Sequence, residues 1–488
     1  MTRTIELFRS ALGLVKERCG HVAAQPERTI LLVTILVMSV VSAVTGFVLA
    51  QYYSIDVLSS LIFEPHDCWL DWGMNVGRHC FSDYTMPVTL GLRANPWEPY
   101  PAYSDPSHAP FRNNYPPAAM IPHLAFGLLG KWLHAPRFGL FGYLLALGLA
   151  VFSPAAWAAR GALGMDKVVV FIACGVAAVP AWMALDRGNS VGFVVPIALA
   201  FLVALRRQRW GIAAAMVILA ALVKPQFVLL AVVLFAARQW RQGGIAVTAA
   251  AALNLAAYAL WPRDFPNTIE QSLGSTLDAG AFQRLAFGLN VSFGRAVLVI
   301  PDSIAALRHG GTIPDGFLLG VRSLAGYGVL IVVAICLLVL GRRVSPVMAG
   351  IAMLATASLF PPLSQPYYLV FALPVAALIV HDPDGPPATG IFDRLESSGG
   401  RRRVMGISIT VAAALSLAQI ALPSPSVRVP IVGQLGLPGV VVTTAPLVIS
   451  SASNVPIFWL IAVAAVIVSY ARKPAFPMTE TALCDSVR

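Results

Sequence analysis

Charged residues are scarce in this sequence. Asp, Glu, Lys and Arg make up only 12% of the 488 residues, whereas hydrophobic residues make up 57%, and the mean hydropathy is +0.74. Soluble domains carry about 25% charged residues, because their surface must face water. The scarcity of charge excludes a soluble domain and predicts an all-α, polytopic integral membrane protein.

Common motifs of soluble enzymes are also missing. The sequence contains no Walker loop, no dinucleotide-binding GxGxxG and no HExxH, so nucleotide-dependent chemistry has no support. Its six cysteines are scattered, without CxxC spacing or Cys/His groups, and we expect neither a metal site nor a cofactor. Only Cys68 and Cys80 fall in one loop, where a disulfide and two free thiols remain equally open.

The charges that are present are mostly positive. The net charge of +11 would suggest nucleic acid as the partner of a soluble protein. Here, however, Lys and Arg cluster in short segments between apolar runs, a pattern typical of cytoplasmic loops. We therefore expect no nucleic-acid partner, and we place these segments and both termini on the cytoplasmic side of the plasma membrane.

Long apolar runs dominate the rest of the chain, and each spanning helix needs about 20 residues. The runs cover residues 29–50, 138–158, 167–185, 189–205, 244–261, 322–341, 346–360, 367–381, 404–422 and 453–471. A further apolar stretch, 211–237, has basic residues at both ends, and it is too long for one span and too short for two. We predict a re-entrant hairpin there, broken at Lys224-Pro225, and about 11–12 membrane helices in total.

This topology predicts one domain over residues 1–488. Its longest outer loop, 51–137, is rich in Trp, Tyr, Pro and Asp and should form a folded surface. Within it, 117–134 resembles a helix that lies at the membrane interface. The loop 381–403 and the tail 472–488 should be cytoplasmic.

Lys224 needs an explanation, because an ammonium group at bilayer depth costs roughly 3 kcal/mol on insertion scales. One possibility is that its alkyl chain lets it reach the interface. The other is a site for an anionic substrate, shared with Gln226. The hairpin and the adjacent proline favour the second possibility, since reaching the interface requires neither.

Other polar residues are expected at the outer ends of the same helices, where they would converge on one membrane face. These candidate substrate-binding residues are Tyr115, Asp186, Arg187, Asn189, Asn290, Ser292, Ser364, Gln365, Tyr367 and Tyr368. Tyr367 and Tyr368 also suit a role as interfacial anchors of a helix end.

Several of these residues belong to an ordered set of motifs. "LDWG", "NYPP", "DRGNSVGF", "LVKPQF", "LNVSFGR" and "LSQPYY" follow one another between about residues 67 and 381. Their order and spacing resemble glycosyltransferase family 87, whose members use polyprenyl-phosphate sugars. The "KP", "NxS" and "LxQxYY" versions look most like actinobacterial arabinofuranosyltransferases. Related mannosyltransferases are less similar, because they have a His-rich segment in place of "LSQPYY".

The resemblance implies a GT-C fold with its active site at the extracytoplasmic face. It implies a polyprenyl-phosphate sugar donor, with arabinofuranose the best match, a cell-envelope glycan or glycolipid acceptor, and inversion of the anomeric centre without a metal. The family base is an acid of the first outer loop, normally followed by an aromatic residue and then by a tyrosine. Carried over to "LDWG", this points to Asp71 as the catalytic residue, with Asp67 as its rival.

Two other classes remain open at this point. A secondary transporter also has about twelve spans and broken helices, but no internal repeat is visible and the polar residues gather at one face. A lipid-linked glycan polymerase or ligase would use the same kind of cleft. The sequence therefore favours a membrane glycosyltransferase, with a mannosyltransferase as the nearest alternative.

Overall fold

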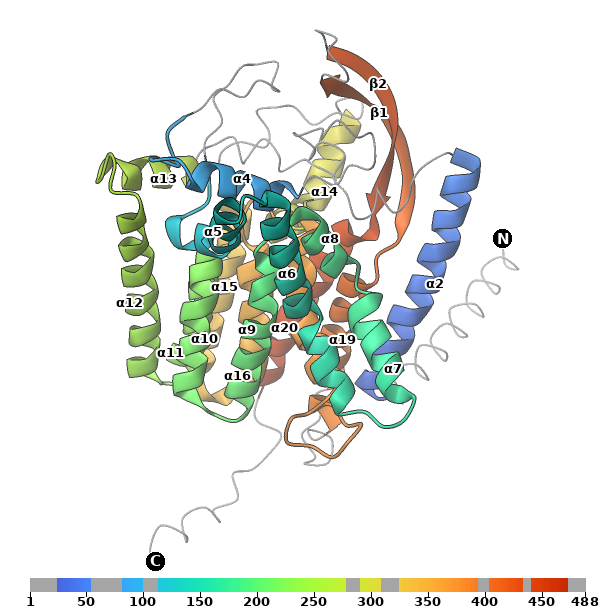
Figure 1. Cartoon of the computed structure of the whole chain (residues 1–488). Helices are drawn as coiled ribbons and strands as arrows, with labels where there is room; N and C mark the ends of the chain where they lie inside the picture. The colour runs from blue at the N-terminus through green and yellow to red at the C-terminus, as the bar shows by residue number, and fades with distance from the viewer. Residues whose placement is uncertain are drawn as a thin grey trace, which may run out of the picture.

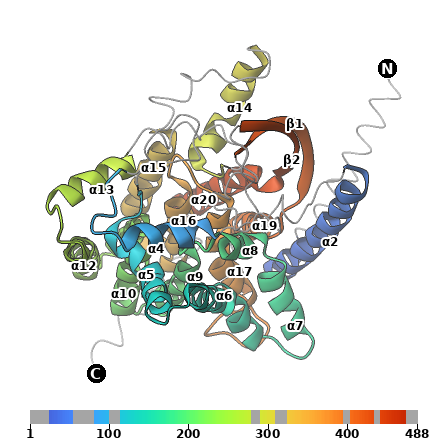
Figure 2. The same cartoon turned by 45° about the horizontal axis from the view of Figure 1, so that its top comes forward.

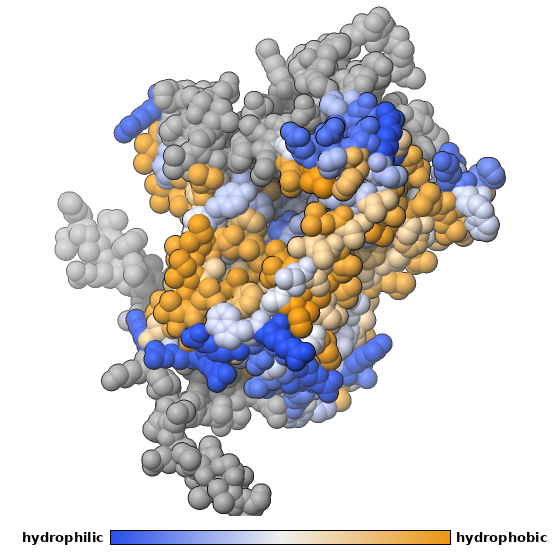
Figure 3. All heavy atoms as spheres, turned by 90° about the vertical axis from the view of Figure 1, so that its left-hand side faces the viewer, coloured by the Kyte–Doolittle hydropathy of each residue, from blue (hydrophilic) through white to orange (hydrophobic). Residues whose placement is uncertain are grey.

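The computed structural model describes residues 24–53, 81–99, 113–277, 290–308, 324–393, 403–432 and 440–472. Most helices lie side by side, with their axes roughly aligned, and form a bundle (Figure 1). Its members include α2 (Glu27–Tyr53), α6 (Pro136–Arg160), α9 (Val191–Arg206), α12 (Trp240–Ala257), α15 (Ala325–Leu340) and α20 (Val455–Ala471). Figure 3 shows apolar residues around the middle of this bundle and hydrophilic residues at both ends.

Five of the described helices are long and apolar enough to cross a membrane. They are α2, α6, α12 with η3 (Tyr258–Leu260), α15 with η7 (Gly341–Arg343), and η9 (Ser451–Asn454) with α20. The run α7 (Asp166–Phe171), η1 (Ile172–Val176) and α8 (Val179–Arg187) is long and apolar enough only as a pair of segments bent by 49°, and counted as one span it brings the number to six. The multi-pass, helical membrane fold is thereby confirmed.

Six shorter apolar helices complete the bundle. They are α9, α10 (Trp210–Val223), η2 (Pro225–Leu230) with α11 (Ala231–Ala236), α16 (Pro346–Leu359), η8 (Pro366–Phe371) with α17 (Ala372–Val380), and α19 (Arg403–Leu417). Residues 347–359 of α16 and all of α17 are buried. Such helices are apolar on every side because they have neighbours on every side.

The stretch 211–237 is broken where the sequence predicts. Helix α10 ends at Val223, Lys224 adopts an extended conformation (φ −145°, ψ 110°), and Pro225 begins η2. A residue before proline is pushed out of the helical region, so the dipeptide itself causes the break. In Figure 1, α10 rises from the lower end of the bundle, and α11 returns to that end before α12 begins.

Shorter elements cover the upper end of the bundle. In Figure 1, α4 (Ser82–Gly91) and α13 (Asn267–Leu277) lie across it, while α5 (Pro117–Trp132) packs on α4 and α6. Helix α14 (Phe293–Arg308) and an antiparallel pair of strands, β1 (Ala421–Val432) and β2 (Val440–Ser450), also lie there. Figure 2 shows the curved strands beside α20 and α4 crossing the bundle. The strand pair was not expected from the sequence.

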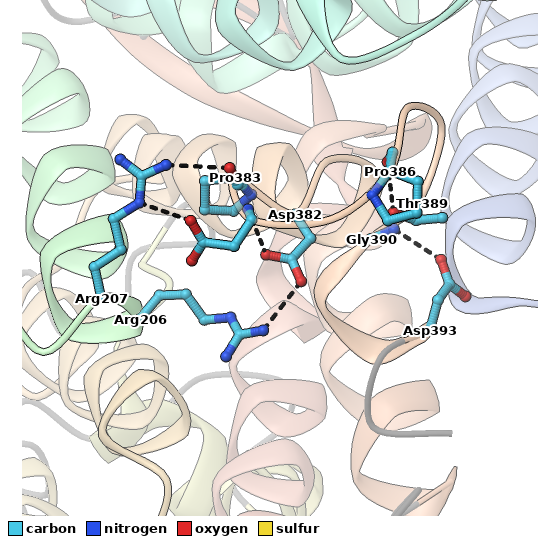
Figure 4. A network of polar contacts seen from close by, with 9 residues as sticks. Arg206, Arg207, Asp382, Pro383, Pro386, Thr389, Gly390 and Asp393 are labelled. Atoms are coloured by element: carbon cyan, nitrogen blue, oxygen red, sulfur yellow. Dashed lines mark hydrogen bonds and ion pairs between the residues drawn. The ribbon is translucent and has the colours of Figure 1, made fainter. Parts of the chain in front are cut away.

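The lower end of the bundle carries the basic C-terminal end of α9. There, the loop after α17 folds against α9 (Figure 4). Arg206 Nη2 lies 3.1 Å from Asp382 Oδ2, and Arg207 Nε lies 2.9 Å from Asp384 Oδ1. The Asp382 side chain is fully buried. The first half of the loop 381–403 is therefore a packed part of the bundle.

Candidate active site

A tight turn after α8 brings two site residues to one carboxylate. Helix α8 ends at Arg187, and Gly188 follows in the left-handed conformation (φ 63°), which a side chain would strain. Asn189 then donates from Nδ2 to Asp83 Oδ2 at 2.8 Å, and Arg187 donates from Nε to the same oxygen at 3.2 Å. The turn therefore directs Arg187 and Asn189 toward Asp83.

Asp83 lies in the first turn of α4, where a negative charge also suits the helix dipole. Burial opposes its ionisation, but the Arg187 charge, the Asn189 hydrogen bond and the Lys224 charge outweigh burial and lower the pKa of Asp83 below its ordinary value. Its side chain keeps 16% of its surface exposed. Asp83 is thus an ionised carboxylate that a small substrate group can reach.

Lys224 reaches this region from the break between α10 and η2. Its side chain is 8% exposed, and Nζ lies 4.5 Å from the centre of the Tyr115 ring, a cation–π contact. Tyr115 is held by Asn113, whose Oδ1 accepts from the Tyr115 N–H at 3.0 Å. The ammonium group therefore faces the interior of the protein, which argues against the alternative in which it reaches the lipid interface.

The polar residues at the start of η8 complete the group. Tyr367 lies under the Arg187 guanidinium, with 5.7 Å between the guanidinium carbon and the ring centre, and the Tyr367 and Tyr368 rings are 5.2 Å apart. Tyr368 is hydrogen-bonded to Gln226. We call the set of residues that these contacts connect the polar cluster: Asp83, Tyr115, Arg187, Asn189, Lys224, Gln226, Tyr367 and Tyr368.

Aromatic side chains form a wall that packs against the polar cluster. His123 of α5 is fully buried, stacks on Tyr143 at 5.1 Å and meets Tyr115 edge-on at 5.6 Å. Tyr143 in turn donates its hydroxyl to the Gly188 carbonyl at 2.9 Å. This wall therefore fixes both Tyr115, which contacts Lys224, and the turn that presents Arg187.

The remaining sequence-predicted residues have other partners. Asn290 Oδ1 accepts from the N–H groups of Ser292 and Ser364, at 3.0 and 3.1 Å, and its Nδ2 donates to the Pro362 carbonyl. These bonds join the segment before α14 to the segment before η8. Asn290, Ser292 and Ser364 therefore have a structural role, since they hold the two segments together. Gln365 is buried beside them, and Asp186 is half-buried in α8.

Asp83 was missed by the sequence analysis. Asp71, the predicted base, and its rival Asp67 lie outside the described residues, as do Cys68 and Cys80. A usable signal existed, because "FSDY" places an aromatic residue directly after an acid of the first outer loop. That is the beginning of the pattern expected around the family base.

The fold and the cluster define a multi-pass membrane protein with ionised and aromatic groups gathered at one end of its bundle. The model of glycosyltransferase family 87 matches residues 113–370, just over half of the chain, and the protein belongs to this family. No curated protein matches the chain. The protein is therefore a membrane glycosyltransferase with a sugar donor and an acceptor, and the transporter alternative is excluded.

The matched region contains all of the polar cluster except Asp83, which lies upstream of residue 113. In the described ranges, no group of three or more His, Cys, Asp or Glu residues is arranged to hold a metal ion. The polar cluster itself offers a carboxylate, two cations and several hydroxyl and amide groups.

Proposed function

We propose that the protein transfers a sugar from a polyprenyl-phosphate donor to a cell-envelope glycan or glycolipid, with inversion. The observation that carries this proposal is the electrostatic interaction between an ionised Asp83 and Lys224, which the hairpin places at the same end of the bundle. Transfer from a phosphate-linked sugar needs a base for the acceptor hydroxyl and a cation for the leaving phosphate. The polar cluster supplies both.

In this mechanism Asp83 accepts the proton of the acceptor hydroxyl. The hydroxyl oxygen bonds to the anomeric carbon while the bond between that carbon and the phosphate oxygen breaks, and the lipid phosphate leaves with the bonding electrons. Lys224 stabilises the charge that grows on the phosphate. Attack and departure on opposite faces of the sugar invert the anomeric centre.

The basic helix ends support the sidedness of the reaction. Arg206, Arg207 and the loop at Asp382 lie at the lower end of the bundle, whereas the polar cluster lies at the upper end. Basic loops remain on the cytoplasmic side of a plasma membrane. We therefore assign the polar cluster to the extracytoplasmic face, where the donor and the envelope acceptor would meet.

The sugar is inferred from the "LSQPYY" segment and its neighbours. These motifs resemble those of arabinofuranosyltransferases, and the structure brings Tyr367 and Tyr368 of this segment into the polar cluster. We therefore propose arabinofuranose as the donor sugar. Mannose is the alternative to be compared.

The test uses purified protein in liposomes with decaprenyl-phosphoryl arabinofuranose or mannose and an arabinan or mannoside acceptor. Mass spectrometry and NMR of the product identify the sugar and the anomer. Product from the mannose donor alone would contradict the proposed sugar, and absence of product from both would contradict the proposed donor class.

The Lys224 assignment is tested in the same assay. Lys224→Ala should weaken donor binding by about 10- to 100-fold, as expected when a charged hydrogen-bonding group is lost, and Lys224→Arg should retain part of it. Lys131→Ala, at the exposed end of α5, is the matched control. Equal donor binding by Lys224→Ala and the control would refute the phosphate role.

A further inference from the structure

A long apolar groove runs along the outer side of α6. It has a volume of about 780 Å³ and is lined by α6 from Leu144 to Arg160, with Phe171, Leu185 and Leu199 opposite. At 1.5 Å per residue, its α6 wall is about 24 Å long, close to the roughly 30 Å core of a bilayer. Its shape therefore suits an extended hydrocarbon chain better than a compact ligand.

The bent span opposite α6 explains why the groove is open. The segments Asp166–Val176 and Val179–Arg187 meet at an angle of 49°. Across the break, Trp182 Nε1 donates to the Val176 carbonyl at 2.8 Å. A bent segment cannot fill the side of a straight helix along its whole length, so space remains beside α6.

The groove faces lipid, and its wall includes α8, the helix that ends at Arg187 of the polar cluster. Leu145 and Leu149 on its rim are 55% and 69% exposed, on a helix suited to cross the membrane. At its upper end the groove is lined by Leu185. Leu185 lies two residues before Arg187, whose side chain donates a hydrogen bond to Asp83. None of the residues of the polar cluster lines the groove itself.

We infer that this groove binds the isoprenoid chain of the lipid-linked donor, an inference that rests on the proposed function. A donor of this class must place its phosphate at the polar cluster while its chain stays in an apolar environment. The groove offers such an environment from Leu185 downward, and among the described residues that line it only Ser153, Trp157 and Arg160 carry a polar atom in the side chain. A sugar would find too few hydrogen-bonding partners there.

Gly148 allows the groove to be blocked without damage to the fold. A Cβ atom at Gly148 would meet only Leu185 Cδ2, at an ordinary contact distance of 3.8 Å. A leucine at this position would therefore project into the groove. Gly328 of α15 has nothing within 4 Å of such an atom, and Gly328→Leu is the matched control in another membrane helix.

The experiment compares two donors with the same sugar, one on decaprenyl phosphate and one on geranyl phosphate. Gly148→Leu should raise the KM for the decaprenyl donor about tenfold or more, because several methylene groups lose their apolar contacts. Gly148→Ala should give an intermediate rise. The kcat values, the KM for the geranyl donor, and both KM values of Gly328→Leu should stay as in the unmodified protein.

A KM for the decaprenyl donor that is unchanged in Gly148→Leu would overturn the inference. Binding of sugar-free decaprenyl phosphate, measured by native mass spectrometry, separates this failure from failure of the proposed function, because it needs no turnover. Loss of that lipid in Gly148→Leu but not in Gly328→Leu supports the groove. A co-purified phospholipid that only Arg160→Gln releases, with decaprenyl phosphate retained by Gly148→Leu, assigns the groove to a structural lipid and also overturns the inference.

Discussion

At the scale of single residues, Asp83 combines two properties that a catalytic base requires. It is ionised, because Arg187, Asn189 and Lys224 together outweigh the effect of burial on its pKa. It also remains partly accessible, unlike the fully buried Asp382 at the other end of the bundle.

We expect Asp83→Asn to lower kcat by roughly a hundredfold to ten-thousandfold, because the amide keeps the shape of the side chain but cannot take a proton. Donor binding should change little. The same assay on Asp71→Asn and Asp67→Asn decides between the acids of the first outer loop. A wild-type kcat in Asp83→Asn, together with an inactive Asp71→Asn, would show that the base is Asp71, as predicted from the sequence, and not Asp83.

The buried His123 should make the stability of the fold depend on pH. Burial, reinforced by the Lys224 charge, lowers its pKa from 6.5 to about 3. The unfolded chain therefore binds a proton below pH 6.5 that the folded protein does not bind until about pH 3, and stability falls as the pH falls through this window. The cost at pH 5 is about 2 kcal/mol.

Thermal unfolding in detergent at pH 7.5 and pH 5.0 measures this effect. His123→Phe, which preserves an aromatic ring against Tyr143, should lose less stability on acidification than the unmodified protein. His134→Phe changes an exposed histidine and serves as the control. An equal loss in all three proteins would show that other groups cause the acid sensitivity.

At the scale of elements, the sequence predicts the membrane helices well but does not predict the strand pair. Each expected apolar run contains a helix, because a lipid environment forces every backbone group to bond within its own segment. The strands β1 and β2 were missed, although β2 is rich in Val and Thr, which favour strands, because β1 has three Val but also three Pro, which disfavour them. This segment lies outside the apolar runs, where hydropathy gives no information on backbone pairing.

The sequence also predicted part of the candidate site. Lys224, Arg187 and Tyr367 were found because each stands at a helix end on the same side. The position of Asn290 gave the same expectation, yet its side chain bonds to neighbouring backbone groups. A polar residue at a helix end can face a cavity or satisfy a loop, and only the packing of distant segments decides which.

The hairpin α10–η2–α11 predicts the accessibility of its two ends. In a cysteine-free background, Gln208→Cys and Arg241→Cys should react with a membrane-impermeant thiol reagent from the cytoplasmic side only. Arg263→Cys, after α12, should react from the opposite side. Labelling of positions 208 and 241 from opposite sides would mean that the stretch crosses the membrane once.

At the scale of the whole molecule, the two ends of the bundle carry opposite tasks. The upper end gathers the groups proposed for chemistry, and the lower end holds helices together through the loop at Asp382 (Figure 4). Two adjacent arginines at this end differ in one respect. Arg206 pairs with a fully buried carboxylate, whereas Arg207 pairs with Asp384, which is 36% exposed.

Replacing each arginine by glutamine tests how much this difference matters. Arg206→Gln leaves the buried Asp382 without its cation and should destabilise the protein by about 3–5 kcal/mol. Arg207→Gln should cost less than about 1 kcal/mol. Thermal unfolding of the two variants in the same detergent gives the comparison, and equal losses would show that burial of Asp382 does not make its ion pair stronger.

The break at Lys224 also affects how the chain is made. Helix α10 has 14 residues, about 21 Å, which is too short to cross a bilayer core of roughly 30 Å, and it is followed by Lys224, a residue type that the translocon disfavours. A nascent chain that stops there has no reason to keep α10 in the membrane. Insertion of α10 must therefore await the synthesis of α11 and α12, and reporter proteins fused after Val223 would describe the truncated chain instead of the finished enzyme.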